Sequence, residues 1–121
     1  MSERIKVLFV CSKNQWRSPT AEAIYRDDPR VGVRSRGTAN AARRTVRAVD
    51  LAWADLVLMM ENRHRRRLLA MFPRETQFLQ IEVLHIRDHY QFMDPELVEM
   101  IRTAAEPIID GLRVQQSTEE S

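Results

Sequence analysis

The segment Ile5-Lys6-Val7-Leu8-Phe9-Val10-Cys11-Ser12-Lys13-Asn14-Gln15-Trp16-Arg17-Ser18-Pro19 decides the fold. Its apolar first part, residues 5–10, predicts a buried strand, and residues 20–26 predict a helix. The only cysteine of the chain therefore lies in a tight loop between a strand and a helix. We expect Ser18 to be the helix N-cap and Pro19 to take the first helical position, where a backbone N–H would have no partner.

Such a loop has a chemical consequence. A loop that wraps over a helix N-terminus points several backbone N–H groups at one spot, and the helix dipole adds partial positive charge there. A phosphate-type oxyanion fits this environment, and Arg17 can donate two parallel hydrogen bonds to it. The same field favours the thiolate of Cys11, which is the nucleophilic form, and the hydroxyl of Ser18 is placed to donate to it.

The segment from residue 7 to residue 25 resembles the low-molecular-weight protein tyrosine phosphatases, whose signature is Cys-x-Gly-Asn-x-x-Arg-Ser-Pro. Lys13 replaces the glycine of this signature, and Trp16 stands where many members carry a second cysteine. Later segments resemble the family more loosely, namely Ser35-x-Gly37-Thr38 and the Asp-hydrophobic-Met strand of residues 55–60. The residues that match the signature are Cys11, Asn14, Arg17, Ser18 and Pro19.

The order of the predicted elements gives the fold class. Alternating strands and helices predict a doubly wound α/β domain, in which a four-stranded parallel sheet has helices on both faces. The resemblance implies the same architecture, and we expect residues 1–121 to form a single phosphatase-like domain. Ligands in such folds bind beyond the carboxyl ends of the strands, where Cys11 lies. The expected strands are residues 5–10, 31–35, 55–60 and 77–84, and the expected helices are residues 18–27, 40–54, 61–71 and 94–113.

Composition limits the compartment and the kinds of partner that we expect for the protein. The chain has 121 residues and a net charge of +2, too small a bias to indicate a nucleic-acid partner. A single cysteine cannot form an internal disulfide, which favours a reducing compartment. The polar N-terminus lacks the apolar core of a signal peptide, and no segment has the length of a membrane helix. We therefore expect a cytoplasmic protein with no membrane partner.

A phosphatase of this kind needs a second catalytic group. A thiolate that attacks a phosphomonoester expels an alkoxide or phenoxide, which a nearby carboxylic acid can protonate. The family places an aspartate for this role late in the chain, in an Asp-Pro-aromatic loop. Asp88-His89-Tyr90 matches two of these positions, whereas Asp94-Pro95 matches the dipeptide but also suits a helix N-cap. We favour Asp88 as the general acid.

The predicted site combines catalytic and binding residues. The catalytic residues are Cys11, Arg17 and Asp88, and the residues expected to bind substrate are Ser12, Lys13, Asn14, Gln15, Trp16 and Ser18. Asn14 is expected to hold the loop in a left-handed conformation, and Lys13 loses the freedom of glycine if its φ must be positive. Trp16 and Tyr90 are candidates to flank the pocket, although Trp16 suits the core equally. We expect no cofactor and no metal ion.

Three functions remain open at this stage. The first is a cysteine-dependent phosphomonoester hydrolase, by resemblance a protein tyrosine phosphatase, acting on a phosphorylated protein or a small phosphomonoester through a phosphocysteine. The second is a non-catalytic phosphate- or RNA-binding module that uses the run from Arg63 to Arg67 as a basic surface; the same run also suits a solvated helix face. The third is arsenate reduction, which with Cys11 alone requires an external thiol.

Overall fold

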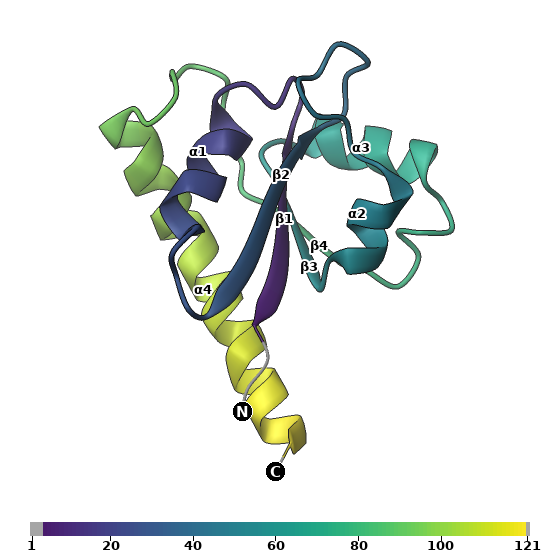
Figure 1. The fold of residues 1–121 in the computed structure, drawn as a ribbon, viewed down its shortest axis with the longest axis vertical. Helices are drawn as coiled ribbons and strands as arrows, with labels where there is room; N and C mark the ends of the chain where they lie inside the picture. The colour runs from purple at the N-terminus through teal and green to yellow at the C-terminus, as the bar shows by residue number, and fades with distance from the viewer. Residues whose placement is uncertain (1–3, 121) are drawn as a thin grey trace.

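The computed structural model describes residues 4–120, and the side chains among them as far as residue 115. Helices and strands alternate along the described residues, as Figure 1 shows. The elements are β1 (Ile5–Cys11), α1 (Arg17–Tyr25), β2 (Val31–Gly37), α2 (Ala48–Trp53), β3 (Leu56–Met59), α3 (Asn62–Met71), β4 (Gln80–Val83) and α4 (Pro95–Glu120). The strands form one parallel four-stranded sheet in the order β2-β1-β3-β4, which confirms the predicted fold class.

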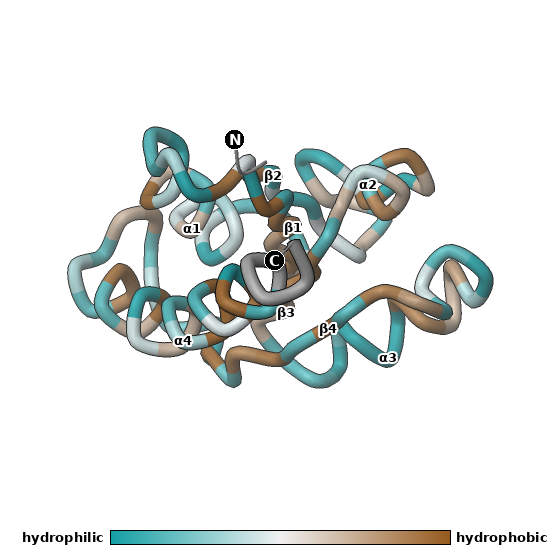
Figure 2. Tube along the Cα trace, turned by 90° about the horizontal axis from the view of Figure 1, so that it is seen from below, coloured by the Kyte–Doolittle hydropathy of each residue, from teal (hydrophilic) through white to brown (hydrophobic). Residues whose placement is uncertain are grey.

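Strand β1 is the centre of the core because its two sides supply both apolar clusters. Val7 and Phe9 point to one face of the sheet and pack with residues of α1 and α4. Leu8 and Val10 point to the other face and pack with residues of α2 and α3. The apolar strands accordingly lie between two helical layers, as Figure 2 shows. A strand buried on both faces needs a continuous apolar run, as in residues 7–10.

The strand order explains where a ligand can bind. The chain leaves β1 for β2 on one side and later returns to β3 on the other side of β1. A parallel sheet opens a crevice at such a switch point, beyond the carboxyl ends of the two diverging strands. Cys11 is the last residue of β1 and therefore lies at the base of that crevice.

The first helix begins two residues before Pro19, the predicted first helical position, and its cap is different. The helix starts at Arg17 after Trp16, and no side chain caps it. The predicted N-cap role of Ser18 is therefore wrong, because Ser18 lies inside the first turn. Its hydroxyl bonds to the sulfur of Cys11 and the amide of Asn14 instead.

Three other segments differ from the sequence prediction. The helix expected over residues 40–54 is confined to Ala48–Trp53, since residues 38–47 form a loop that packs on the segment after Cys11. The strand expected over residues 77–84 is confined to Gln80–Val83, and Phe78 before it is 91% exposed. Helix α4 continues through Pro107 to Glu120, although the last residues were expected to fray. Among the described helices, none combines the length and the apolar composition needed to cross a bilayer.

Candidate active site

The loop after β1 is held by its carbonyl groups. The carbonyl oxygens of Cys11, Ser12 and Lys13 accept hydrogen bonds from the N–H groups of Thr38, Ala39 and Arg43, at 2.9 to 3.0 Å. The peptide bonds here are trans, so each N–H points away from the carbonyl of the same peptide unit. The N–H groups of residues 12–14 consequently point to the inner side of the loop. This is the arrangement that binds an oxyanion.

Gly37 allows this close approach of the two loops. A Cβ at this position would lie 2.5 Å from the carbonyl oxygen of Ser12 and 2.9 Å from the backbone nitrogen of Asn14. Ala42 Cβ would also lie 2.6 Å away, and none of these three atoms can rotate away. Only glycine therefore lets the end of β2 pack against the loop that follows β1.

Asn14 has the left-handed backbone predicted for it, with φ at 53°. Among the described residues, the others with positive φ are His85 and Met93. Lys13 therefore has an ordinary backbone conformation, and its replacement of the family glycine introduces no strain. The side chain of Lys13 lines the pocket, where it adds a positive charge.

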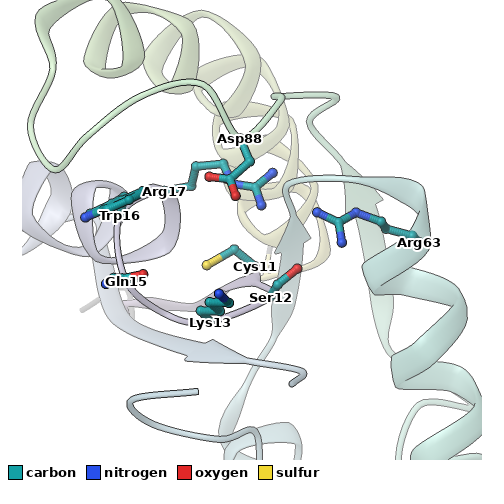
Figure 3. Close-up of a pocket in the computed structure, with 8 residues that line it drawn as sticks. All are labelled: Cys11, Ser12, Lys13, Gln15, Trp16, Arg17, Arg63 and Asp88. Atoms are coloured by element: carbon teal, nitrogen blue, oxygen red, sulfur yellow. The ribbon is translucent and has the colours of Figure 1, made fainter. Parts of the chain in front are cut away.

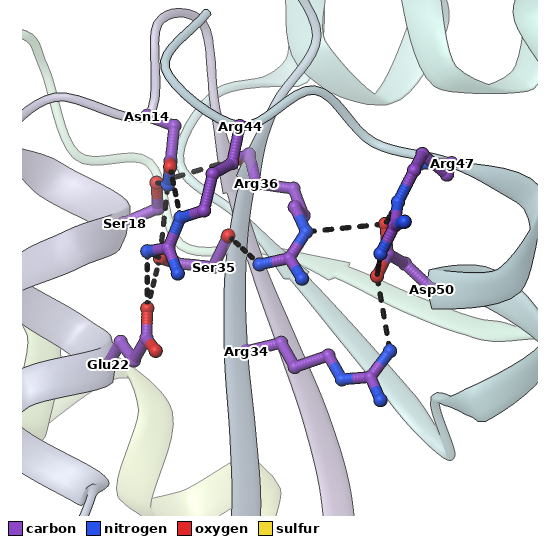
Figure 4. A network of polar contacts seen from close by, with 9 residues as sticks. All are labelled: Asn14, Ser18, Glu22, Arg34, Ser35, Arg36, Arg44, Arg47 and Asp50. Atoms are coloured by element: carbon purple, nitrogen blue, oxygen red, sulfur yellow. Dashed lines mark hydrogen bonds and ion pairs between the residues drawn. The ribbon is translucent and has the colours of Figure 1, made fainter.

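A polar network behind the loop fixes the orientation of Asn14 (Figure 4). The Glu22 carboxylate accepts a hydrogen bond from the Ser35 hydroxyl at 2.5 Å and another from Arg44 at 2.8 Å. Arg44 Nε also donates to Asn14 Oδ1 at 3.1 Å. The oxygen of the amide thus faces Arg44, and its nitrogen faces the two serine hydroxyls, Ser18 and Ser35.

The same network sets the direction of the Ser18 hydroxyl. Asn14 Nδ2 donates to Ser18 Oγ at 3.0 Å, so the hydroxyl proton of Ser18 must point elsewhere. Cys11 Sγ lies 2.9 Å from Ser18 Oγ, whereas the alternative acceptor, the Arg36 carbonyl, is 3.5 Å away. Ser18 therefore donates to the sulfur, which stabilises a thiolate.

Arg17 is buried, and two partners hold its guanidinium in place. Its Nη1 donates to Glu61 Oε1 at 2.5 Å and to the carbonyl oxygen of Ile86 at 2.8 Å. Its Nε lies 3.7 Å from Asp88 Oδ1. Because Nη1 is occupied, Nε and Nη2 form the edge of the guanidinium that can donate two parallel bonds to an oxyanion.

Glu61 is charged at all physiological pH values. Burial alone would raise the pKa of this carboxyl, but hydrogen bonds from Arg63 and Arg17 outweigh burial and lower the pKa to about 2. One carboxylate thus serves two arginines, at 2.5 Å from Arg17 and 3.0 Å from Arg63.

Asp88 reaches the pocket on a loop that is tied down at both ends. The N–H of Ile86 bonds to the Met60 carbonyl, and the N–H of Met93 bonds to Thr20 Oγ1 at 2.9 Å. The Asp88 side chain is 53% exposed and opposite the thiol, as Figure 3 shows. Asp94 instead accepts from the N–H of Glu96 at 2.9 Å, which is an N-cap contact of α4. Asp88 thus lines the pocket, whereas Asp94 caps a helix.

His64 supports the loop from α3. It is 1% exposed, and burial together with the nearby charges of Arg17 and Arg63 lowers its pKa to about 4, so the ring is neutral near pH 7. The N–H of Glu61 donates to Nδ1 at 3.1 Å, which places the ring proton on Nε2. Nε2 then donates to Ser12 Oγ at 2.8 Å, and the hydroxyl proton of Ser12 is free to meet a ligand.

The pocket brings together most of the predicted residues (Figure 3). It has a volume of about 140 Å³. Asn14 and Ser18 lie behind the loop rather than on the pocket wall. Tyr90, expected to flank the pocket, packs against the core, whereas Trp16 is 38% exposed at the rim. The lining residues are Cys11, Ser12, Lys13, Gln15, Trp16, Arg17, Arg63 and Asp88.

Four residues that position the loop were not predicted from the sequence, namely Glu22, Arg44, Glu61 and His64. Glu61 and His64 follow directly after β3, the strand beside β1, so their place at the carboxyl edge of the sheet was a usable signal. Glu22 and Arg44 carried no such signal, because the irregular loop between β2 and α2 brings them together.

No protein-family model matches the sequence, and no curated protein is significantly similar to it. Solved structures are similar in fold. A low molecular weight phosphotyrosine phosphatase from Vibrio cholerae O395 matches with a TM-score of 0.69 and 22% identity, over 92% of this chain and 98% of that one. The tyrosine phosphatase Wzb from Escherichia coli K30, in complex with phosphate, gives 0.70 and 18%, over 91% and 99%.

A third structure is the YwlE arginine phosphatase from Geobacillus stearothermophilus, with a TM-score of 0.63 and 24% identity over 96% of this chain and 95% of that one. The chain thus has the fold of the low-molecular-weight protein tyrosine phosphatases over nearly its whole length. This confirms, at the level of the fold, the resemblance stated from the sequence.

Proposed function

We propose that this protein is a cysteine-dependent phosphomonoester hydrolase, most directly a protein tyrosine phosphatase, that acts through a phosphocysteine intermediate. One observation carries the proposal. Cys11 Sγ lies 2.9 Å from the Ser18 hydroxyl, at the base of a pocket that also contains an immobilised arginine and a carboxyl group. A nucleophile, an anion-binding frame and an acid are the three parts that the reaction needs.

In the first step, the Cys11 thiolate attacks phosphorus, so a P–S bond forms and the P–O bond to the leaving group breaks. The neutral carboxylic acid of Asp88 gives its proton to the departing oxygen. The loop N–H groups and the Nε and Nη2 of Arg17 hold the non-bridging oxygens, where charge develops.

In the second step, the Asp88 carboxylate takes a proton from water, and the water oxygen attacks phosphorus. The P–S bond breaks, inorganic phosphate leaves, and the thiolate is restored with Ser18 as its donor. Because this cycle needs a reduced thiol, we propose the cytoplasm as its location. The substrate is a phosphorylated protein or a small phosphomonoester.

The test is hydrolysis of para-nitrophenyl phosphate and of phosphotyrosine peptides in reductant, with phosphoarginine as a further substrate. Wild type is expected to turn over aryl phosphates, and Cys11→Ser to be inactive. Asp88→Asn is expected to lower kcat by about 100-fold, while Asp94→Asn, which keeps a capping side chain, serves as the matched control. A wild-type protein that binds vanadate but hydrolyses none of these substrates would refute the proposal in favour of a phosphate-binding module.

A further inference from the structure

A second hollow adjoins the candidate active site on the side of α3. It has a volume of about 320 Å³, compared with about 140 Å³ for the catalytic pocket. Ser12 and Arg63 line both, so the two hollows share a wall. We call the second one the α3 lobe. Its polar lining consists of Ser12, Thr38, Asn40, Arg63, His64 and Arg67.

The α3 lobe carries positive charge that the protein does not neutralise. Among the described residues, no acidic side chain lines the lobe, and no carboxylate lies within ion-pair distance of Arg67. Arg67 Nε donates to the Thr38 carbonyl at 2.9 Å, which fixes the guanidinium over the lobe and leaves its Nη groups for another acceptor. Arg63 shares its single carboxylate, Glu61, with Arg17.

The geometry limits how far a second anionic group can lie from the reacting phosphate. Arg63 and Arg67 are four residues apart on α3, so they lie on the same face of the helix, with Cβ atoms about 5–6 Å apart. Arg63 also lines the catalytic pocket. Because Ser12 and Arg63 line both hollows, a ligand that places its phosphate above Cys11 can extend past Arg63 into the α3 lobe.

We propose that the α3 lobe binds a second anionic group of the substrate, and that the preferred substrates are phosphomonoesters carrying a carboxylate or second phosphate close to the ester. This inference rests on the proposed function. The guanidinium groups of Arg63 and Arg67 hold the second anion, and the amide of Asn40 adds a donor at the rim. An acidic phosphopeptide and a small bisanionic ester share this chemistry.

The test compares matched substrates. We would measure kcat/KM for 3-carboxyphenyl phosphate and for 3-carbamoylphenyl phosphate, which differ in charge but little in shape. A second arm compares phosphotyrosine peptides flanked by Glu with peptides flanked by Gln. Intrinsic reactivity differences cancel when the ratio for each pair is compared between protein variants.

Wild type is expected to prefer the charged partner, and Arg67→Gln to lower that preference by about five- to tenfold. Arg67→Lys keeps the charge but loses the bond to the Thr38 carbonyl, so it should retain most of the preference. Arg66→Gln removes the same charge from an exposed site of the same helix that does not line the lobe, and should leave the ratio as in wild type. A preference confined to one arm identifies the small molecule or the peptide as the source.

A preference that is absent in wild type, or that survives in the Arg63→Gln/Arg67→Gln double variant, would overturn the inference. If wild type hydrolyses neither probe of either pair, the proposed function fails. A binding measurement then tests separately whether the α3 lobe holds a second anionic group. Calorimetry on Cys11→Ser should then still show tighter binding of the carboxylate probe than of the carboxamide, and loss of that difference in Cys11→Ser/Arg67→Gln. Equal affinity for the two probes would refute the proposal that the α3 lobe binds a second anion.

Discussion

Ser18 connects the buried polar network to the reactive sulfur. Each hydrogen bond in the chain from Glu22 through Ser35 and Asn14 has a fixed direction, because a carboxylate at one end can only accept. The last hydroxyl proton in that chain is left for Cys11 Sγ, 2.9 Å from Ser18 Oγ. The stability of the thiolate therefore depends on an orientation set by residues outside the pocket.

Ser18→Ala should slow both alkylation of Cys11 by iodoacetamide at pH 7 and aryl phosphate hydrolysis. A hydrogen bond to a charged group contributes about 1.5–3 kcal/mol, so we expect roughly a tenfold to hundredfold fall in rate. Ser18→Thr, which keeps the hydroxyl, provides the comparison, and thermal melting verifies that both variants fold. Alkylation as fast as in wild type would show that the serine does not activate the thiol.

At the scale of elements, replacing either of two glycines by alanine should change the stability of the protein in opposite directions. A Cβ on Gly37 would meet backbone atoms of the loop after Cys11, whereas a Cβ on Gly111 in α4 would meet nothing within 4 Å. Gly37→Ala should destabilise the protein by about 2 kcal/mol and weaken phosphate binding, because the loops must move apart. Gly111→Ala should stabilise it by about 0.5–1 kcal/mol.

Urea denaturation of both glycine variants, together with phosphate titration, measures these effects. The Gly111→Ala variant should bind phosphate as wild type does. If Gly37→Ala kept both wild-type stability and wild-type phosphate binding, the close packing of β2 on the loop would not matter for the site.

The elements also show what the sequence could reveal. The loop from Cys11 to Ser18 was predictable because its motif is continuous in sequence. Strands β1 and β3 were predictable because their apolar runs are buried, and β2 and β4 because apolar and polar residues alternate along them. The N-cap at Ser18 was wrong because the helix begins at Arg17, which places Ser18 inside the first turn, where its hydroxyl bonds to Cys11 Sγ and Asn14 Nδ2. The strand expected to include Phe78 was too long, since apolar residues outside a sheet look the same in sequence as those within it.

At the scale of the whole molecule, the candidate active site and the stability of the fold depend on the same edge of the sheet, because His64 is buried there. The pKa of His64 is about 4 in the fold and 6.5 in a solvated chain, so the unfolded chain binds a proton that the folded one does not. The contribution of neutral His64 to the free energy of unfolding is complete above pH 6.5. It is lost progressively as the pH falls from 6.5 through 4. It amounts to about 3 kcal/mol.

Denaturant unfolding between pH 4 and pH 7 should therefore show stability rising with pH in wild type. His64→Gln should flatten this slope, and His89→Gln, at an exposed position, should preserve it. Glu61 affects stability in a different pH range. Because its pKa is lowered from 4.5 to about 2, its protonation destabilises the fold only below pH 4.5. An unchanged slope in His64→Gln would exclude His64 as its origin.

The central claim is that Cys11 carries the phosphoryl group during turnover. The most direct measurement is rapid acid quenching of the enzyme during hydrolysis of para-nitrophenyl phosphate, followed by mass spectrometry of the peptide that contains Cys11. The account predicts a phosphorylated Cys11 whose amount increases in Asp88→Asn. The weakly basic para-nitrophenolate leaves with little help from an acid, whereas the water that removes the phosphate has lost its base. Steady turnover with no phosphate on Cys11, or with phosphate on another residue, would contradict it.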